Sequence, residues 1–276
     1  MHRLLFLNVL PTRWRIPAKL AILLATVFFV CFPNPSLFVE HVRRWRNPNQ
    51  LVDPHSPALD PLAVEVQAQI PPDAAPADVL KTVEKYVLKR VAYEWDWNNW
   101  GNADFIPTVA ETLQKGKEDC DGRAVVAASL LTRIGYPAQI VTDFSHVWVT
   151  TEYGDLMGPG QTQAIVATGE GLKIKSSAWK PLAKALAYCV APFPLPRELI
   201  ILAVLWWLLL RIGIGAGWSL VALAFMLNGL LFMRVGGENY WKPVVWMQLV
   251  GLTNLIGGIF CLFLRSRQNS GAVRSE

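Results

Sequence analysis

Long apolar runs at both ends of the chain constrain its fold more than any other feature. The clearest are Ile214 to Met233 and Val244 to Leu264, and a shorter run, Ala18 to Phe32, lies near the N-terminus. A membrane-spanning helix needs about 20 apolar residues, or somewhat fewer when basic side chains at its ends reach the headgroups. The chain is 53% hydrophobic and 17% charged, whereas soluble domains carry about a quarter charged residues. The sequence therefore predicts a membrane protein.

Residues 1–33 have the pattern of a signal sequence that stays attached. Arg13, Arg15 and Lys19 form the positively charged region before the apolar core. The small residues of a cleavage site are missing, because Cys31 to Pro35 ends the run. We expect an uncleaved signal anchor, with a cleaved signal peptide as the alternative.

Residues 197–265 are predicted to form a membrane region with about three helices, followed by a polar tail at 266–276. The first run, Leu199 to Leu210, is short unless it extends past Arg211. The total is four spans with the anchor, or three if the runs on either side of Arg211 form one kinked element. Four spans put both ends on one side, and their basic flanks favour the cytoplasm. We expect a multi-pass protein of the plasma (inner) membrane with an extracytoplasmic domain, although the basic cluster Arg43 to Arg46 opposes this orientation.

The net charge of +5 is attributed to basic residues beside apolar runs, where they contact lipid headgroups. No basic patch with interleaved aromatic residues is present, so the sequence predicts no nucleic-acid partner. Residues 34–75 are rich in proline and are expected to form a juxtamembrane linker, with Trp45 suited to the membrane interface. Residues 76–180 have the composition of a globular domain.

Patterns within residues 76–180 predict helices followed by antiparallel strands. Helical spacing covers Asp78 to Tyr93, and a capping box at Thr108 opens a short helix that ends at Gln114. A further helix runs from Cys120 to Ile134. The β-rich runs are Ala138 to Asp143, His146 to Tyr153, Gln163 to Ala167 and Leu172 to Lys175, and a turn is expected at Tyr153-Gly154-Asp155. Helices followed by strands indicate an α+β fold.

Cys120 and His146 are the candidate reactive pair. Cys120 lies at the predicted N-terminus of an apolar helix, where unpaired amides and the helix dipole favour a thiolate. Asp119 and Asp121 oppose this, because nearby carboxylates raise the pKa of a thiol. Arg123 could offset them, so the direction of the net shift in the Cys120 pKa stays open. His146 is the histidine inside the predicted core and could act as the base. A structural cysteine and a structural histidine are the alternative.

No metal and no organic cofactor are expected. One cysteine and one histidine do not supply the four ligands of structural zinc, and no calcium-loop pattern is visible. Cys31 and Cys261 lie in apolar runs, which leaves a Cys120–Cys189 disulfide open as a possibility.

Five segments resemble the transglutaminase-like superfamily, in the same order along the chain. They are Tyr93-Glu94-Trp95-Asp96 with Trp100-Gly101, Pro107 to Leu113, Gly116 to Gly122, Leu130 to Ala138, and His146-Val147-Trp148-Val149. The bacterial transglutaminase-like cysteine peptidases are the nearest relatives by this comparison. The resemblance covers Tyr86 to Asp155, roughly a quarter of the chain.

The resemblance implies a papain-like domain with Cys120 as nucleophile, His146 as base and a third residue that orients the imidazole. Asp155 is the first choice for that residue. Because Asp155 falls in the predicted turn, a glutamine near Gln161 is the alternative. The spacing of Gln114 resembles that of the oxyanion glutamine of papain-like enzymes, with an exposed helix-end glutamine as the alternative.

The function implied by the resemblance is that of a membrane-anchored cysteine hydrolase, a peptidase or amidase. Such an enzyme would act through a thioester on a peptide or protein at the cell envelope, and transfer to a lysine amine would give cross-linking instead. A non-catalytic binding or assembly module is the alternative from another class. A transporter is a third possibility, which the scarcity of strongly polar residues in the apolar runs opposes.

Overall fold

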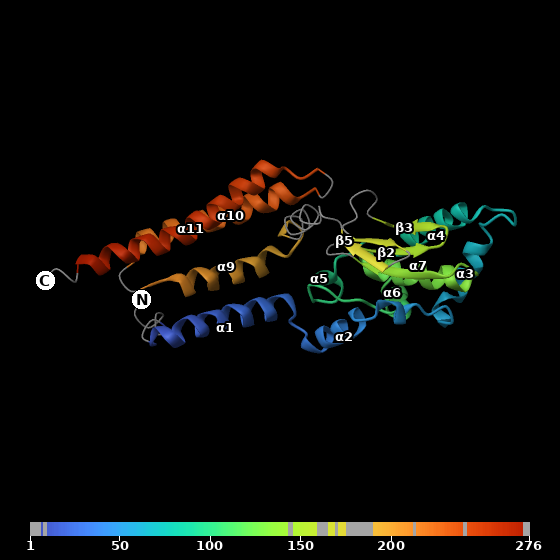
Figure 1. The fold of residues 1–276 in the computed structure, drawn as a ribbon, viewed down its shortest axis with the longest axis horizontal. Coiled ribbons are helices and arrows are strands. Elements are labelled where there is room, and N and C mark those ends of the chain that lie inside the picture. The colour runs from blue at the N-terminus through green and yellow to red at the C-terminus, as the bar shows by residue number, and fades with distance from the viewer. Residues whose placement is uncertain are drawn as a thin grey trace. The chain divides into compact units, whose positions relative to one another are not determined.

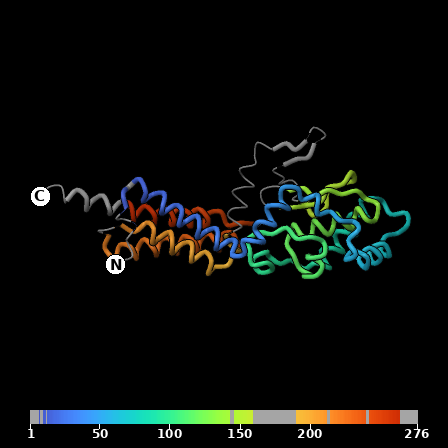
Figure 2. Tube along the Cα trace, turned by 90° about the horizontal axis from the view of Figure 1, so that it is seen from below, coloured from blue at the N-terminus to red at the C-terminus, as the bar shows by residue number. Residues whose placement is uncertain are grey.

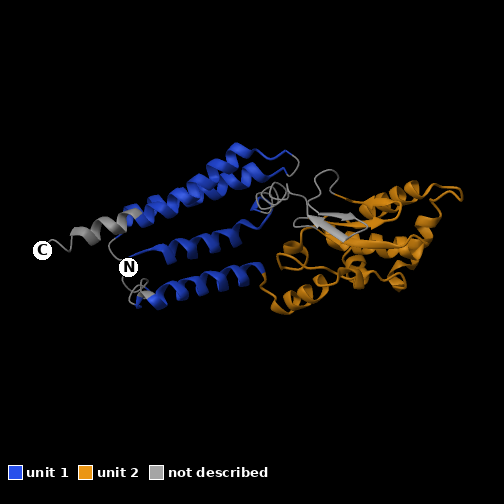
Figure 3. Cartoon of the chain, in the orientation of Figure 1, with its two compact units in different colours: residues 1–31, 183–276 blue, residues 32–182 orange. Residues whose placement is uncertain are grey.

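The structure is a computed structural model that describes residues 7, 10–142, 146–158, 165–168, 171–174, 190–211, 214–239 and 242–272. The chain divides into two compact units (Figure 3). One unit contains residues 1–31 and 183–276, and the other contains residues 32–182.

The first unit is a group of long apolar helices (Figure 1). They are α1 (Thr12–Cys31), α9 (Leu195–Leu209), α10 (Ala216–Gly237) and α11 (Val245–Ala272). Within the described residues, three helices are long and apolar enough to cross a membrane: Arg13–Cys31, Ala216–Gly237 and Val245–Phe263. Helix α9 has 15 residues, shorter than the roughly 20 that a span needs. A fourth span therefore stays a prediction.

Helices α10 and α11 run side by side in both views (Figures 1 and 2) and pack through glycine. A Cβ built on Gly251 would lie 2.7 Å from the carbonyl oxygen of Gly229, and one on Gly229 would lie 2.6 Å from the oxygen of Gly251. The amide of Asn254 donates a hydrogen bond to Oδ1 of Asn228 at 2.7 Å. Small residues and amide pairs of this kind hold helices together in lipid, where apolar burial gives little driving force.

We predict that Gly251→Ala destabilises the helical unit, whereas Gly257→Ala does not. A Cβ at Gly257 would meet nothing within 4 Å, so it serves as the matched control on the same helix. The expected loss at Gly251 is about 1–3 kcal/mol, the usual cost of overpacking. Thermal unfolding of the full-length protein in detergent measures it, and equal midpoints for the two variants would contradict the close approach of α10 and α11.

The second unit has an α+β fold, as the sequence predicts. Its helices are α2 (Pro35–Trp45), η2 (Pro48–Leu51), η3 (Pro57–Leu59), α3 (Asp60–Gln67), α4 (Pro76–Arg90), α5 (Asp96–Asn99), α6 (Val109–Lys115) and α7 (Cys120–Arg133). Strands β1 (Ala138–Thr142), β2 (Val147–Thr151) and β3 (Gly154–Leu156) form one antiparallel sheet in that order, and β4 (Ile165–Thr168) pairs with β5 (Gly171–Ile174).

Helix α7 is the centre of the core. Apart from Arg123, its residues from Asp121 to Leu131 are buried. It packs against α4, α6, β1 and β2. This nearly complete burial explains why its apolar residues run almost continuously instead of forming one stripe.

Two features differ from the sequence-based expectation. The segment 34–75 is expected as a linker, but it contains α2 and α3, and Leu59, Leu62 and Val66 lie in the core with α7. The hairpin turn lies at Glu152–Tyr153, and Thr151 pairs with Gly154, so Asp155 is in strand β3 rather than in the turn. Gly154, at φ 133°, adopts a backbone conformation that other residues seldom reach.

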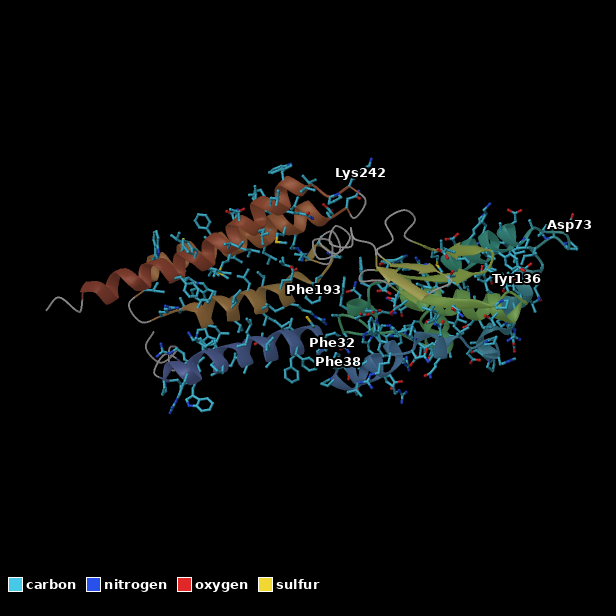
Figure 4. The ribbon with its side chains drawn as sticks, viewed as in Figure 1. Phe32, Phe38, Asp73, Tyr136, Phe193 and Lys242 are labelled. Carbon is cyan, nitrogen blue, oxygen red and sulfur yellow. The ribbon has the colours of Figure 1, made fainter. Side chains whose placement is uncertain are left out.

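The capping box at Thr108 is present as predicted. The Thr108 hydroxyl accepts the Glu111 N–H, and the Glu111 carboxylate accepts the Thr108 N–H at 2.7 Å. Arg44 of α2 binds the same carboxylate at 2.7 Å. These contacts attach helix α2 to the domain. The ring of Phe32, just before α2, contacts the ring of Phe38 within α2, with centroids 4.7 Å apart (Figure 4).

Candidate active site

Cys120 is the first residue of α7 and is partly buried. Asp119 caps the helix, because its carboxyl group accepts the N–H of Asp121 at 3.3 Å. Oδ1 of Asp121 likewise accepts the Gly122 N–H at 2.7 Å, so carboxyl groups satisfy two amides of the first turn. The packing of α7 in the core therefore fixes Cys120 at the positive end of a helix.

His146 lies directly before strand β2, and β2 packs against α7, the helix that begins at Cys120. The His146 ring lies nearly parallel to that of Trp148, at 12° with centroids 6.3 Å apart. His146 and Trp148 thus share one face, as strand alternation predicts. That Cys120 and His146 form a reactive pair stays a prediction.

The Nε2 atom of His146 lies 2.6 Å from the main-chain oxygen of Met157. A carbonyl oxygen can only accept, so this contact assigns the hydrogen to Nε2 and leaves Nδ1 as the basic nitrogen of a neutral ring. Asp155 has an exposed side chain and pairs in register with Thr150, four positions along the strand from His146. Its role as third residue stays a prediction, and Gln161 lies outside the described residues.

Four carboxyl groups gather at the N-terminus of α7. Oxygens of Asp96, Glu118, Asp119 and Asp121 lie within 4.8 Å of one another. The sequence drew attention to Asp119 and Asp121 but not to the other two. Asp96 and Glu118 come together through a long-range contact that no local sequence pattern reveals. The chain at Ala92 pairs with Lys117, which brings the start of α5 next to Glu118.

Neutral donors surround part of this acidic cluster. The Oε2 atom of Glu118 accepts from the Asn99 amide at 2.8 Å and from the Trp100 indole N–H at 2.7 Å. Oδ2 of Asp96 accepts the Phe105 N–H at 2.7 Å. A Cβ at Gly122 would lie 2.1 Å from Cγ of Glu118. The lack of a side chain at position 122 therefore allows Glu118 to lie against the helix.

The surroundings of Cys120 indicate the direction of its pKa shift, which the sequence left open. Burial, and then the charge of Asp119, raise the pKa of the Cys120 thiol well above its ordinary value, although the Val147 N–H lowers it. The Arg123 guanidinium donates to the Val91 carbonyl at 2.8 Å and lies over the Tyr93 ring. Arg123 is therefore engaged by other groups, and burial and the carboxyl groups favour the neutral thiol of Cys120.

The carboxyl groups also raise one another's pKa values. Burial is the largest cause for Asp96, Asp119 and Asp121, and neighbouring acids add to it. Asp96, Asp119 and Asp121 therefore favour the protonated form. The same four oxygens could instead hold a hard cation such as calcium or magnesium, which binds oxygen ligands.

Gln114 lies exposed on α6, in agreement with the alternative of a helix-end glutamine. The backbone amide of Cys120 is a candidate oxyanion donor, because it lies in the first turn of α7.

A cysteine at the start of a buried helix, with a histidine on the antiparallel sheet packed against it, is the arrangement of the papain-like α+β class. Comparison with known families gives a more specific result. Residues 63–167 match the sequence model of the transglutaminase-like superfamily, so the chain carries a transglutaminase-like domain together with its candidate membrane helices. Searches of curated proteins and of solved structures found no match.

We predict that Asp121→Asn flattens the dependence of stability on pH. A carboxyl group whose pKa is raised in the folded state holds its proton there after the unfolded chain has lost it. The stability that this group contributes is therefore present at acid pH, and it is lost as pH rises from about 4 through the raised pKa of the folded state. Asparagine reproduces the protonated form without titrating.

Thermal midpoints of the full-length protein in EDTA, measured from pH 5 to pH 8, test this. As pH rises from 5 to 8, the thermal midpoint of the asparagine variant should fall less than that of the wild type. The difference should be roughly 2–4 °C for each kcal/mol of stability that the wild type loses and the variant keeps. Asp73→Asn, on the exposed loop between α3 and α4 (Figure 4), is the control. Parallel curves for Asp121→Asn and the wild type would mean that the cluster does not hold protons in this range.

Proposed function

We propose that this protein is a membrane-anchored cysteine hydrolase of the transglutaminase-like type, which cleaves amide bonds in a peptide or protein substrate. The observation that carries the proposal is the packing of α7, which begins at Cys120, against strand β2, which begins directly after His146. A nucleophile needs a base within hydrogen-bond reach, and we assign that role to His146.

In the proposed reaction, the Cys120 sulfur attacks the substrate carbonyl carbon while His146 takes the thiol proton. Because the pKa of the thiol is raised, proton transfer accompanies the attack rather than preceding it. The Cys120 amide stabilises the oxyanion. The C–N bond then breaks, and the leaving amine takes the proton from His146. Water, activated by His146, hydrolyses the thioester and frees the Cys120 thiol.

Water is the proposed acyl acceptor. A lysine amine in its place would form an isopeptide cross-link through the same thioester. We further propose that the protein lies in the plasma membrane as a multi-pass protein with this domain on the extracytoplasmic side. The basic residues Arg13, Arg15 and Lys19 in the N-terminal part of the first candidate span support this orientation.

A second candidate is a non-catalytic binding or assembly module. The raised pKa of Cys120 and the carboxyl groups around it favour this function, because catalytic cysteines commonly have depressed values.

Alkylation of Cys120 distinguishes the two functions. We predict that His146→Ala slows iodoacetamide labelling of Cys120 at pH 7 by at least about tenfold, a threshold below the roughly 10²–10⁴-fold that general-base assistance contributes to turnover. The full-length protein is used with Cys31, Cys189 and Cys261 replaced by serine, so that labelling reports on Cys120.

His55→Ala is the matched control, because His55 is a histidine of the same unit that lies on an exposed turn. The enzyme hypothesis requires that only the His146 variant is slow. If both variants label like the wild type, the binding-module hypothesis takes precedence.

A further inference from the structure

We propose that Glu84, on helix α4, is a positioning residue that aims the Met157 carbonyl at His146 and so holds the imidazole toward Cys120. The proposal rests on the proposed function, in which His146 is the base. In this proposal, the group that orients His146 is a main-chain carbonyl, which a carboxylate on α4 holds in place. It takes the role that an acidic side chain on the sheet would otherwise have.

The first step is the partner of His146. Nε2 lies 2.6 Å from the Met157 oxygen, and this contact fixes both the tautomer and the tilt of the ring. An orienting hydrogen bond of this kind is what the third member of a catalytic triad supplies. The Met157 carbonyl therefore takes that place in the geometry.

The second step is the conformation of Met157. Its φ is 55°, in the left-handed region that a residue with a long side chain seldom adopts, and among the described non-glycine residues it alone has a positive φ. Strand β3 ends at Leu156, which is fully buried. The left-handed residue turns the chain out of the sheet and directs its carbonyl to His146. Such a conformation persists only where the surroundings hold it.

The third step is what holds Met157. The Oε1 atom of Glu84 accepts the Met157 N–H at 2.9 Å. Both polar groups of the Met157 main chain thus bind side chains, the N–H to Glu84 and the carbonyl to His146. Glu84 has a fixed position, because Val83 and Val87 on the same helix are completely buried. Helix α4 lies beside β3 (Figure 1).

The chemical consequence concerns charge. A carbonyl holds the ring in the required tautomer but carries no formal charge, so it stabilises imidazolium less than a carboxylate does. A base arranged in this way suits a reaction in which the thiol starts neutral. Glu84 acts through its hydrogen bond to Met157, and its acceptor oxygen, not its size, is the property that matters.

Two substitutions of similar size distinguish the effect of the acceptor oxygen at position 84 from the effect of side-chain size. Glu84→Gln keeps an oxygen that accepts the Met157 N–H, whereas Glu84→Met keeps the length without a carboxyl or amide oxygen. Lys85→Ala, at the next and exposed position of α4, is the control. The assay is the rate of iodoacetamide labelling of Cys120 at pH 7 in the full-length protein without its other cysteines. His146→Ala is measured in parallel, and thermal midpoints check folding.

We expect Glu84→Met to slow labelling about tenfold, the lower end of what losing a histidine-orienting partner costs at metal sites. Glu84→Gln and Lys85→Ala should stay within about twofold of the wild type, which would be rescue by the conservative variant. Equal rates for the Gln and Met variants, whether fast or slow, would overturn the assignment of Glu84. If His146→Ala also labels like the wild type, the proposed function fails. If His146→Ala alone is slow, only the assignment of Glu84 fails.

Discussion

The candidate site depends on the burial of α7. This helix lies in the middle of the domain, with its apolar residues enclosed by α4, α6 and the sheet. Burial of that apolar surface fixes the helix axis, and the axis fixes where Cys120 meets β2. The packing of α7 against β2, which begins directly after His146, is therefore a product of the hydrophobic core.

The same burial creates the electrostatic character of the site. Carboxyl groups that would ionise freely in water lie together beneath the start of α7, where desolvation raises their pKa values and that of Cys120. A negative cluster next to a thiol works against a resting thiolate. In the proposed reaction, the thiol therefore gives up its proton during the attack, and taking that proton is the role that the proposal assigns to His146.

The two units are stabilised by different physics. In the domain, large apolar side chains such as Leu130, Leu131 and Phe105 are removed from water. In the helical unit, α10 and α11 approach through Gly229 and Gly251, and an amide pair links them. Lipid gives no gain for burying leucine, so close backbone contact and hydrogen bonds take its place.

The sequence alone determined the features that depend on neighbours in the chain. Apolar runs revealed the candidate spans, a capping box revealed α6, and the order of helices and strands gave the α+β fold with Cys120 and His146 as the candidate pair. These signals are local, because periodicity and capping act within a few residues. Tertiary structure decided what depends on register and long-range pairing. It moved the hairpin turn to Glu152–Tyr153, joined Asp96 to Glu118 through the pairing of Ala92 with Lys117, and brought Glu84 to Met157 across 73 positions of sequence. No local pattern encodes such contacts, since they exist only once the core has closed around α7.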